Sequence, residues 1–184
     1  GLFNFEDVAA GVNKKMIHRH PHVFGDQKAA NADDVNTIWD NQKDKEKKSN
    51  NANSSALDDV TMALPALLRA QKLQKKAARQ GFEWSEMDDF LAKLDEEMAE
   101  FKQAVQSGLS TEEIEGEIGD ILFVIANIGR KYGINAETAL RRTNDKFVKR
   151  YKGMEEDLKT ENKTIAGQPV NDLIALWRDQ KTKS

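Results

Sequence analysis

Four acidic residues flank one predicted turn in the middle of the chain. Glu97 and Glu100 precede the turn at Ser107–Ser110, and Glu117 and Asp120 follow it at matching distances from its centre. Two antiparallel helices would therefore bring the four carboxylates to the same heights. Carboxylates that face one another repel unless a cation neutralises them. Because oxygen ligands without His or Cys favour Mg²⁺ or Mn²⁺, the sequence predicts a metal site on a helical hairpin.

Two amphipathic helices are predicted to carry these acids. The first opens with a capping-box pattern at Ser85, and the second opens at Ser110, three residues before Glu113. Their expected apolar stripes are Leu91, Leu94, Met98, Phe101 and Val105 in the first helix, and Ile114, Ile121, Val124, Ile125 and Ile128 in the second. Glu97 and Glu100 are predicted at one edge of the first stripe. Glu117 falls within the second stripe and Asp120 on its flank, where an unpaired charge is costly.

A Lys–Arg pair further along the chain indicates what reaction such a site would support. Lys146 and Arg150 are four residues apart in a predicted helix and share one face. Bound magnesium can bridge phosphate oxygens and activate a water, while Lys and Arg neutralise charge in the transition state. The sequence lacks both the G-x-x-x-x-G-K-[ST] loop of P-loop enzymes and the Glu-x-x-His pairs of di-iron bundles. The pattern therefore predicts phosphoryl chemistry by a different class of enzyme.

Helical periodicity predicts an all-α fold. The expected helices cover residues 5–19, 33–48, from about Pro65 to Gly81, the two acidic helices, 136–159 and 170–181. Gly133 is expected to end the second acidic helix, and Asn135 to cap the helix that follows.

A polar segment divides the chain. Between Trp39 and Leu57 the only apolar residues are two alanines, so we predict a linker at residues 44–56. Residues 13–20 resemble residues 144–151, because both follow the pattern N-x-K-Φ-x-x-R-(H/Y), where Φ is apolar. Residues 38–43 resemble residues 176–181, because each segment has a Trp with Gln-Lys three residues later. We therefore predict that residues 1–43 are the tail of an incomplete N-terminal repeat and that residues 57–184 are its complete copy. Because residue 1 is glycine rather than an initiator methionine, we expect a trimmed piece of a longer protein.

Composition limits the partners. The formal net charge of -3 provides no basic field for nucleic acid. Cysteine is absent, which excludes disulfides and thiol catalysis and agrees with a reducing compartment. No segment approaches the ~20 apolar residues of a membrane span. We expect a cytoplasmic protein that binds neither membrane nor nucleic acid.

The chain resembles the MazG family, in the all-α nucleoside triphosphate pyrophosphohydrolase superfamily, over nearly its whole length. The segments that carry the resemblance are RAQKLQKKAARQGFEW (69–84), EEMAE (96–100), EGEIGDILF (115–123), NDKFVKRY (144–151) and the terminal Trp177; RHPHVFGD (19–26) and SALDDVTMALPAL (55–67) resemble the junction between the two MazG repeats. The resemblance implies a MazG-like helical bundle intertwined as a homodimer. It also implies Mg²⁺-dependent hydrolysis of nucleoside triphosphates to monophosphate and pyrophosphate, with loose base preference and Mn²⁺ as a substitute ion.

The resemblance further assigns residues. Metal ligation is implied for Glu97, Glu100, Glu117 and Asp120, and catalytic roles for Glu96, Glu97, Lys146 and Arg150. Nucleotide contacts are implied for Lys93, Leu94, Asp95, Glu96, Glu97, Glu113, Ile114, Glu115, Gly116, Asp120, Lys146, Phe147, Val148, Lys149, Arg150 and Trp177. In these roles Lys146 and Arg150 hold phosphates, and Trp177 stacks on a base, an interaction that tolerates any base. Glu96 is the candidate to orient or deprotonate the water.

Two other interpretations stay open from the sequence. One is an enzyme specific for a single nucleotide, such as a dUTP or dCTP pyrophosphatase or a phosphoribosyl-ATP hydrolase. The other is a helical dimerisation or regulatory module that binds nucleotide or metal without turnover.

Overall fold

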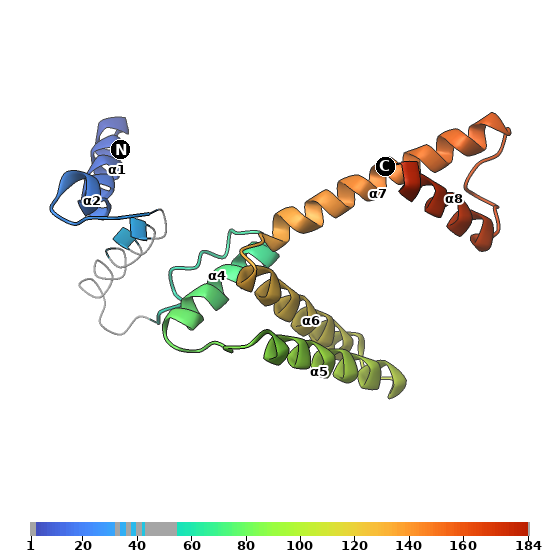
Figure 1. Ribbon diagram of the computed structural model, residues 1–184, viewed down its shortest axis with the longest axis horizontal. Coiled ribbons are helices and arrows are strands. Elements are labelled where there is room, and N and C mark those ends of the chain that lie inside the picture. Colours follow the sequence, from blue (N-terminus) through green and yellow to red (C-terminus); the bar gives the residue numbers. More distant parts are fainter. Residues whose placement is uncertain (1–2, 32–33, 36–37, 40–41, 43–54, 184) are drawn as a thin grey trace. The chain divides into compact units, whose positions relative to one another are not determined.

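Every regular element in the described part of the chain is a helix (Figure 1). The computed structural model describes residues 3–31, 34–35, 38–39, 42 and 55–183, and it confirms the all-α fold class. The chain divides into two compact units, Gly1–Asp58 and Asp59–Ser184. Most of the helix predicted at 33–48, and nearly all of the linker predicted at 44–56, lie outside the described residues.

The first unit contains helix α1, Phe5–Arg19, and the short helix α2, Pro21–Phe24. The bounds of α1 agree with the prediction. A capping box between Asn4 and Asp7 fixes its start. Sequence reasoning missed α2, which begins at a proline, a residue that suits the first helical position.

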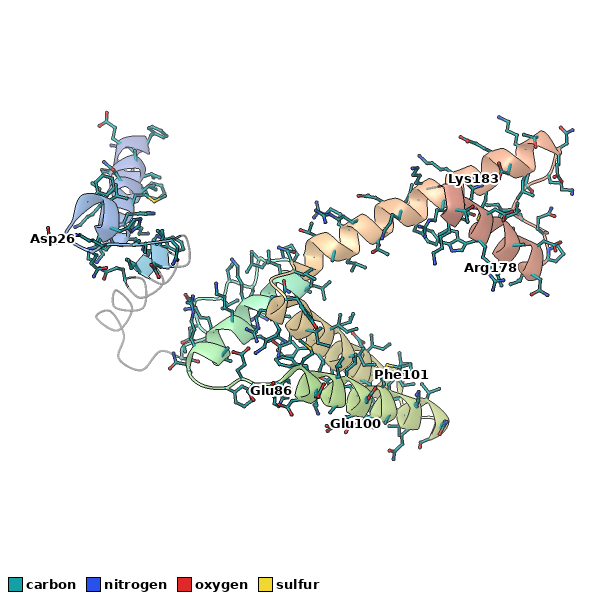
Figure 2. The ribbon with its side chains drawn as sticks, in the orientation of Figure 1. Asp26, Glu86, Glu100, Phe101, Arg178 and Lys183 are labelled. Atoms are coloured by element: carbon teal, nitrogen blue, oxygen red, sulfur yellow. The ribbon has the colours of Figure 1, made fainter. Side chains whose placement is uncertain are left out.

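The second unit contains five helices, and all were predicted to within a few residues. They are α4 (Ala66–Arg79), α5 (Met87–Gln106), α6 (Thr111–Lys131), α7 (Ala136–Thr160) and α8 (Val170–Lys183). Figure 1 shows α5 and α6 side by side as a hairpin. Helix α4 packs against α6 and α7, and α8 packs along α7. At the end of α8, the Lys183 Nζ lies 2.9 Å from a carboxylate oxygen of Asp157 on α7 (Figure 2).

Local signals fix most helix ends. The capping box of Ser110 and Glu113 opens α6, and the Asn135 side chain accepts a hydrogen bond from the Thr138 amide at the start of α7. Gly108, with φ of +65°, allows the sharp turn between α5 and α6. The capping box predicted at Ser85 is wrong. Helix α5 begins one residue later, after Glu86 and without a side-chain cap, while the Ser85 carbonyl accepts a hydrogen bond from the Lys131 Nζ at 3.2 Å.

The Ser110 cap predicts a pH-dependent stability difference. Ser110 donates to the Glu113 carboxylate through its hydroxyl and its amide, at 2.7 and 2.9 Å, and these bonds hold the pKa of Glu113 below its usual range. A depressed pKa stabilises the fold above the unfolded value of about 4.3, and that contribution is lost as the pH falls through the folded value. We therefore expect Ser110→Ala to lower the thermal midpoint by about 2–4 °C at pH 7 and by less below pH ~4. Differential scanning fluorimetry across this range, with Ser107→Ala as control, tests it; a pH-independent difference would contradict the capping role of Glu113.

Two buried glutamines join α4 to α6. The Gln71 amide nitrogen donates to the carbonyls of Ala126 and Ile134 at 3.0 and 2.8 Å, and its amide oxygen accepts from the Ala136 amide at 3.1 Å. The Gln74 amide nitrogen donates to the Phe123 carbonyl at 2.7 Å. The buried apolar residues of the described chain are few: Val60, Phe90, Ala104, Val124, Ala126, Met154 and Leu158. The Gln71 bonds therefore fix the α6–α7 connection within a small core.

Removing the Gln71 amide should destabilise the second unit. Gln71→Leu leaves the Ala136 amide and the Ile134 carbonyl without their partner, at a cost of about 2–3 kcal/mol. Chemical denaturation measures the loss. Gln103→Leu, at an exposed position of α5, is the matched control and should change stability by less than about 0.5 kcal/mol. Equal stability of the two variants would show that the Gln71 bonds contribute little.

Candidate metal and nucleotide site

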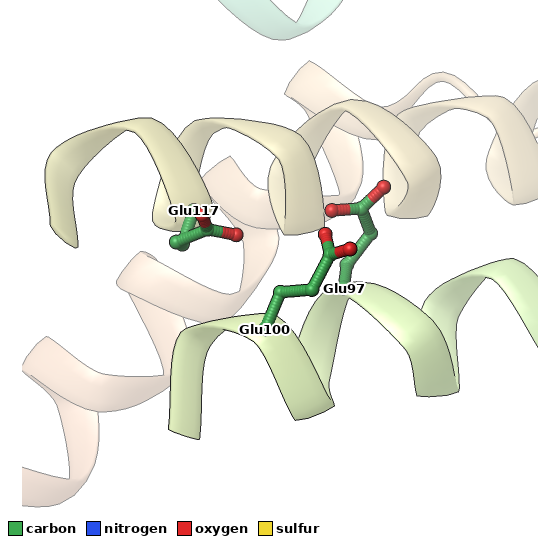
Figure 3. Close-up of side chains that lie close together, drawn as sticks. All are labelled: Glu97, Glu100 and Glu117. Atoms are coloured by element: carbon green, nitrogen blue, oxygen red, sulfur yellow. The ribbon is translucent and has the colours of Figure 1, made fainter. Parts of the chain in front are cut away.

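Three of the four predicted acids come together between α5 and α6. Glu97 and Glu100 on α5 and Glu117 on α6 each offer one carboxylate oxygen, and these oxygens lie within 4.8 Å of one another (Figure 3). Glu97 is buried, Glu117 is half-buried and Glu100 is exposed. In the part of the chain that the structure describes, this is the one such group. Asp120, also on α6, is exposed and is not part of it.

The hairpin buries Glu97 more centrally than the sequence pattern predicts. The buried residues of α5 are Phe90, Glu97 and Ala104, which follow one another at seven-residue intervals, or two helical turns. Glu97 therefore lies in the middle of the face that packs on α6, and the prediction that it lies at the edge of the stripe is wrong. Leu91 and Val105, which were expected in that stripe, are about half exposed.

On α6 the predicted face is largely correct. Ile114, Ile121 and Ile128 are half-buried and Val124 is buried, while Ile125 is exposed. Glu117 lies between Ile114 and Ile121 in this row. The helix thus directs a carboxylate into an otherwise apolar contact, where a charge needs a partner.

The electrostatics of the three carboxylates fit a cation. The Glu117 Oε2 atom is buried and accepts no hydrogen bond from the described protein atoms. Desolvation, and then the negative charge of Glu97, raise the pKa of Glu100. A buried oxygen without a partner and a carboxyl that resists ionisation show that the protein alone does not satisfy this group. The residues therefore fit a hard divalent cation such as Mg²⁺ or Mn²⁺.

A lysine reaches one member of this group. The Lys93 Nζ lies 2.8 Å from the Glu96 Oε1 and 2.9 Å from the Glu97 Oε1. These two hydrogen bonds raise the pKa of the Lys93 ammonium above its usual range. Only the family resemblance drew attention to Lys93 at the sequence level, although its spacing of three and four residues from two glutamates predicts such pairs directly.

The segment Glu113–Gly116 is predicted to contact nucleotide, and it lies within the first two turns of α6. Glu113 is already engaged with Ser110 in the helix cap. Ile114 is half-buried, whereas Glu115 and Gly116 are exposed. Of the predicted α5 contacts, Leu94 is half-buried and Asp95 is exposed.

A second group of predicted residues gathers on α7 and α8. The Arg150 guanidinium carbon lies 5.7 Å from the centre of the Trp177 ring, and the Phe147 ring centre lies 5.2 Å from it. We call Lys146–Arg150 with Trp177 the α7–α8 group. Its remaining members, Lys146, Val148 and Lys149, are exposed.

The hairpin acids and the α7–α8 group do not meet within one chain. Among the described helices, α8 packs against α7 alone and α5 packs against α6 alone. The structure therefore assembles each half of the predicted site but not the two halves together.

The second unit is all-α, and two of its long helices, α5 and α6, form the acidic hairpin. Residues 86–154 match the model of the MazG nucleotide pyrophosphohydrolase domain. The chain is 37% identical over 185 residues to a nucleoside triphosphate pyrophosphohydrolase of Escherichia coli strain K12, covering 98% of this chain and 69% of that protein. It is 35% identical over 181 residues to the nucleoside triphosphate pyrophosphohydrolase/pyrophosphatase MazG of Thermotoga maritima, covering 98% of this chain and 67% of that protein. The chain belongs to the MazG family.

A third relative is longer. The uncharacterized protein YabN of Bacillus subtilis is 43% identical over 181 residues, which cover 98% of this chain and 37% of that protein. The region that matches the domain model contains the hairpin acids and the segment Lys146–Arg150, and it ends before α8 and Trp177.

Proposed function

We propose that this chain hydrolyses nucleoside triphosphates to nucleoside monophosphates and pyrophosphate, with a divalent cation held by Glu97, Glu100, Glu117 and Asp120. The observation that carries the proposal is the approach of three carboxylate oxygens within 4.8 Å across the hairpin, one carboxylate of which has a buried oxygen without a partner. The activities printed for the Escherichia coli and Thermotoga maritima relatives support it. Within the described ranges, no helix combines the length and apolar content that a membrane span requires.

The proposed reaction adds water across the phosphoanhydride bond between the α and β phosphates. When bound, Mg²⁺ would lower the pKa of a water and offset charge on the phosphate oxygens. Glu96, which is exposed beside the acidic group, accepts the proton of the attacking water. Lys146 and Arg150 hold the negative charge of the phosphates as pyrophosphate leaves.

The α7–α8 group supports a broad base preference. Phe147 and Trp177 offer aromatic faces, and Arg150 already stacks on Trp177 at 5.7 Å. Stacking recognises the ring face that every base possesses, so it discriminates little between bases.

We further propose a homodimer in which the hairpin of one copy meets the α7–α8 group of the other. On α6, Ile118, Leu122, Phe123 and Ile125 are 44–46% exposed, and on α7, Leu140, Phe147 and Val148 are 48–54% exposed. Exposed apolar side chains gathered on helix faces in this way favour an association site. A two-fold dimer would cover these apolar side chains. It would also bring Lys146 and Arg150 of one copy to the hairpin acids of the other.

The domain assignment remains part of the proposal: residues 57–184 as the catalytic repeat, and residues 1–43 as the tail of an incomplete one. It is supported by one recurring contact. The Arg19 guanidinium carbon lies 5.7 Å from the Trp39 ring centre in the first unit, as Arg150 does from Trp177 in the second. These residues occupy equivalent positions in the sequence repeat.

A substrate panel tests the function. Pyrophosphate release is measured for the four ribo- and the four common deoxynucleoside triphosphates with Mg²⁺ and with EDTA. We expect release from all of them, with rates within about tenfold because stacking is tolerant of base identity, and none with EDTA. Pyrophosphate release from one nucleotide alone would show single-substrate specificity instead of a broad base preference. No release from any of the nucleotides would favour a non-catalytic module.

A further inference from the structure

Lys93 holds the buried carboxylate of the acidic group. Its Nζ is 2.9 Å from the Glu97 Oε1, and the Glu97 side chain is only 7% exposed. The same ammonium is 2.8 Å from the Glu96 Oε1, on the outer side of α5. Among the ion pairs of the described residues, those that reach this group come from Lys93.

Glu97 needs a cation whether or not a metal is present. A carboxylate buried in a helix contact is strongly destabilising when it is unpaired. Two further carboxylates whose oxygens lie within 4.8 Å add repulsion. In the protein by itself, the Lys93 ammonium is the group that offsets this charge.

A divalent cation and this ammonium compete for the same carboxylate. Both act on Glu97, and two positive charges a few ångströms apart in a partly buried site repel each other. Because the Lys93 ammonium already offsets the negative charge of Glu97 from its Oε1 side, the carboxylate attracts a divalent cation less strongly while the ammonium stays in place. Metal binding therefore includes the cost of weakening a preformed ion pair.

We propose that Lys93 is a built-in counter-ion that neutralises Glu97 in the metal-free protein and is displaced from it when the divalent cation binds. This inference rests on the proposed metal site. It assigns Lys93 two opposite effects: it stabilises the metal-free fold, and it weakens the affinity for the metal. Because Lys93 also holds Glu96, its displacement from Glu97 leaves it beside the residue proposed to accept a proton from water.

The experiment measures Mn²⁺ binding and thermal stability together. Lys93→Met removes the ammonium and keeps a side chain of similar length, and Lys93→Arg keeps the charge. Lys102→Met is the matched control, because Lys102 lies nine residues along the same helix and therefore on its opposite face. Mn²⁺ dissociation constants come from isothermal titration calorimetry, and thermal midpoints are recorded in EDTA and in saturating Mn²⁺.

We expect Lys93→Met to bind Mn²⁺ roughly three- to tenfold more tightly than wild type, the range of one partly exposed ion pair. The thermal midpoint of Lys93→Met in EDTA should be lower than that of wild type. Added Mn²⁺ should raise the midpoint of the variant by more than it raises that of wild type. Lys93→Arg and Lys102→Met should both resemble wild type. Equal or weaker Mn²⁺ binding by Lys93→Met, with wild-type binding intact, would overturn the counter-ion role and leave the metal site standing. Failure of wild type to bind Mn²⁺ would overturn both.

A measurement on the wild-type protein covers the case in which Lys93→Met does not fold. Acylation of lysines by acetic anhydride is followed by mass spectrometry with EDTA and with Mg²⁺. Lys93 should react slowly in EDTA and several-fold faster with Mg²⁺, whereas Lys102 should react equally in both. Unchanged reactivity of Lys93 would contradict its displacement.

Discussion

Glu97→Gln should reduce pyrophosphate release by about 10²- to 10³-fold or more, which is the typical cost of removing one group that stabilises charge at an active site. The amide keeps the size of the side chain but removes the negative charge at the centre of the α5–α6 contact. The fold should persist, because the amide is neutral and the partly exposed Lys93 keeps Glu96 as its partner. Steady-state rates with Mg²⁺ and dATP measure the loss, and the thermal midpoint verifies the fold. Stabilisation by added Mn²⁺ should also diminish.

Glu112→Gln is the control for this variant. Glu112 is exposed in the first turn of α6, outside the acidic group, and the same chemical change there should leave the rate within about twofold of wild type, as expected for a surface position. A Glu97→Gln protein that retains most of its activity would show that the buried carboxylate of the hairpin is not part of the catalytic group.

Two inactive variants should restore activity when they share a dimer. Glu97→Gln disables a hairpin and Lys146→Met disables an α7–α8 group, and each homodimer should be nearly inactive. If each site combines the hairpin of one copy with the α7–α8 group of the other, a heterodimer has one site with both defects and one site with neither. Such a heterodimer, isolated through two different affinity tags, should show about half of wild-type activity.

The matched control pairs two hairpin variants, Glu97→Gln and Glu117→Gln. Every site in that heterodimer has a defective hairpin, so no activity should return. Recovery in the first heterodimer but not in the second would establish the shared site. Absence of recovery in both would show that each chain completes its own site, and would contradict the proposed arrangement.

The positions of the helices could be predicted because their signals are local. The Ser110 capping box, the Asn135 cap and the Gly133 stop after α6 are predicted from a few neighbouring residues, and the structure confirms them. The cap at Ser85 failed because α5 begins one residue later, after Glu86 and without a side-chain cap. The long-range bond from the Lys131 side chain to the Ser85 carbonyl is not visible in that pattern.

Burial was predicted less well because it depends on the partner of each helix. On α5 the seven-residue row of Phe90, Glu97 and Ala104 faces α6, and no rule based on hydrophobicity alone selects a glutamate for its centre. On α7, Met154 and Leu158 are buried, whereas Leu140 and Phe147 are about half exposed. An apolar sequence pattern identifies such a face, but it does not show whether the same chain or a second chain packs against it.

The same distinction applies to the candidate site. Symmetry about one turn correctly grouped Glu97, Glu100 and Glu117, because residues equally far from the turn lie at equal heights on the two helices. The same symmetry also included Asp120, which lies outside this group. The relation of the hairpin to Lys146 and Arg150 is not local, and neither spacing nor periodicity determines it. The ion pairs of Lys93 follow from helical spacing, but their importance becomes clear only from the burial of Glu97.

Analysis of the products of the wild-type protein with dATP tests the proposed activity most directly. Incubation with Mg²⁺ should yield dAMP and pyrophosphate in equal amounts, as resolved by ion-exchange chromatography. Omission of the metal in EDTA, or the Glu97→Gln substitution, should abolish both products. Formation of dADP and phosphate, or pyrophosphate release that persists in EDTA, would contradict a metal-dependent pyrophosphohydrolase built on the acidic hairpin.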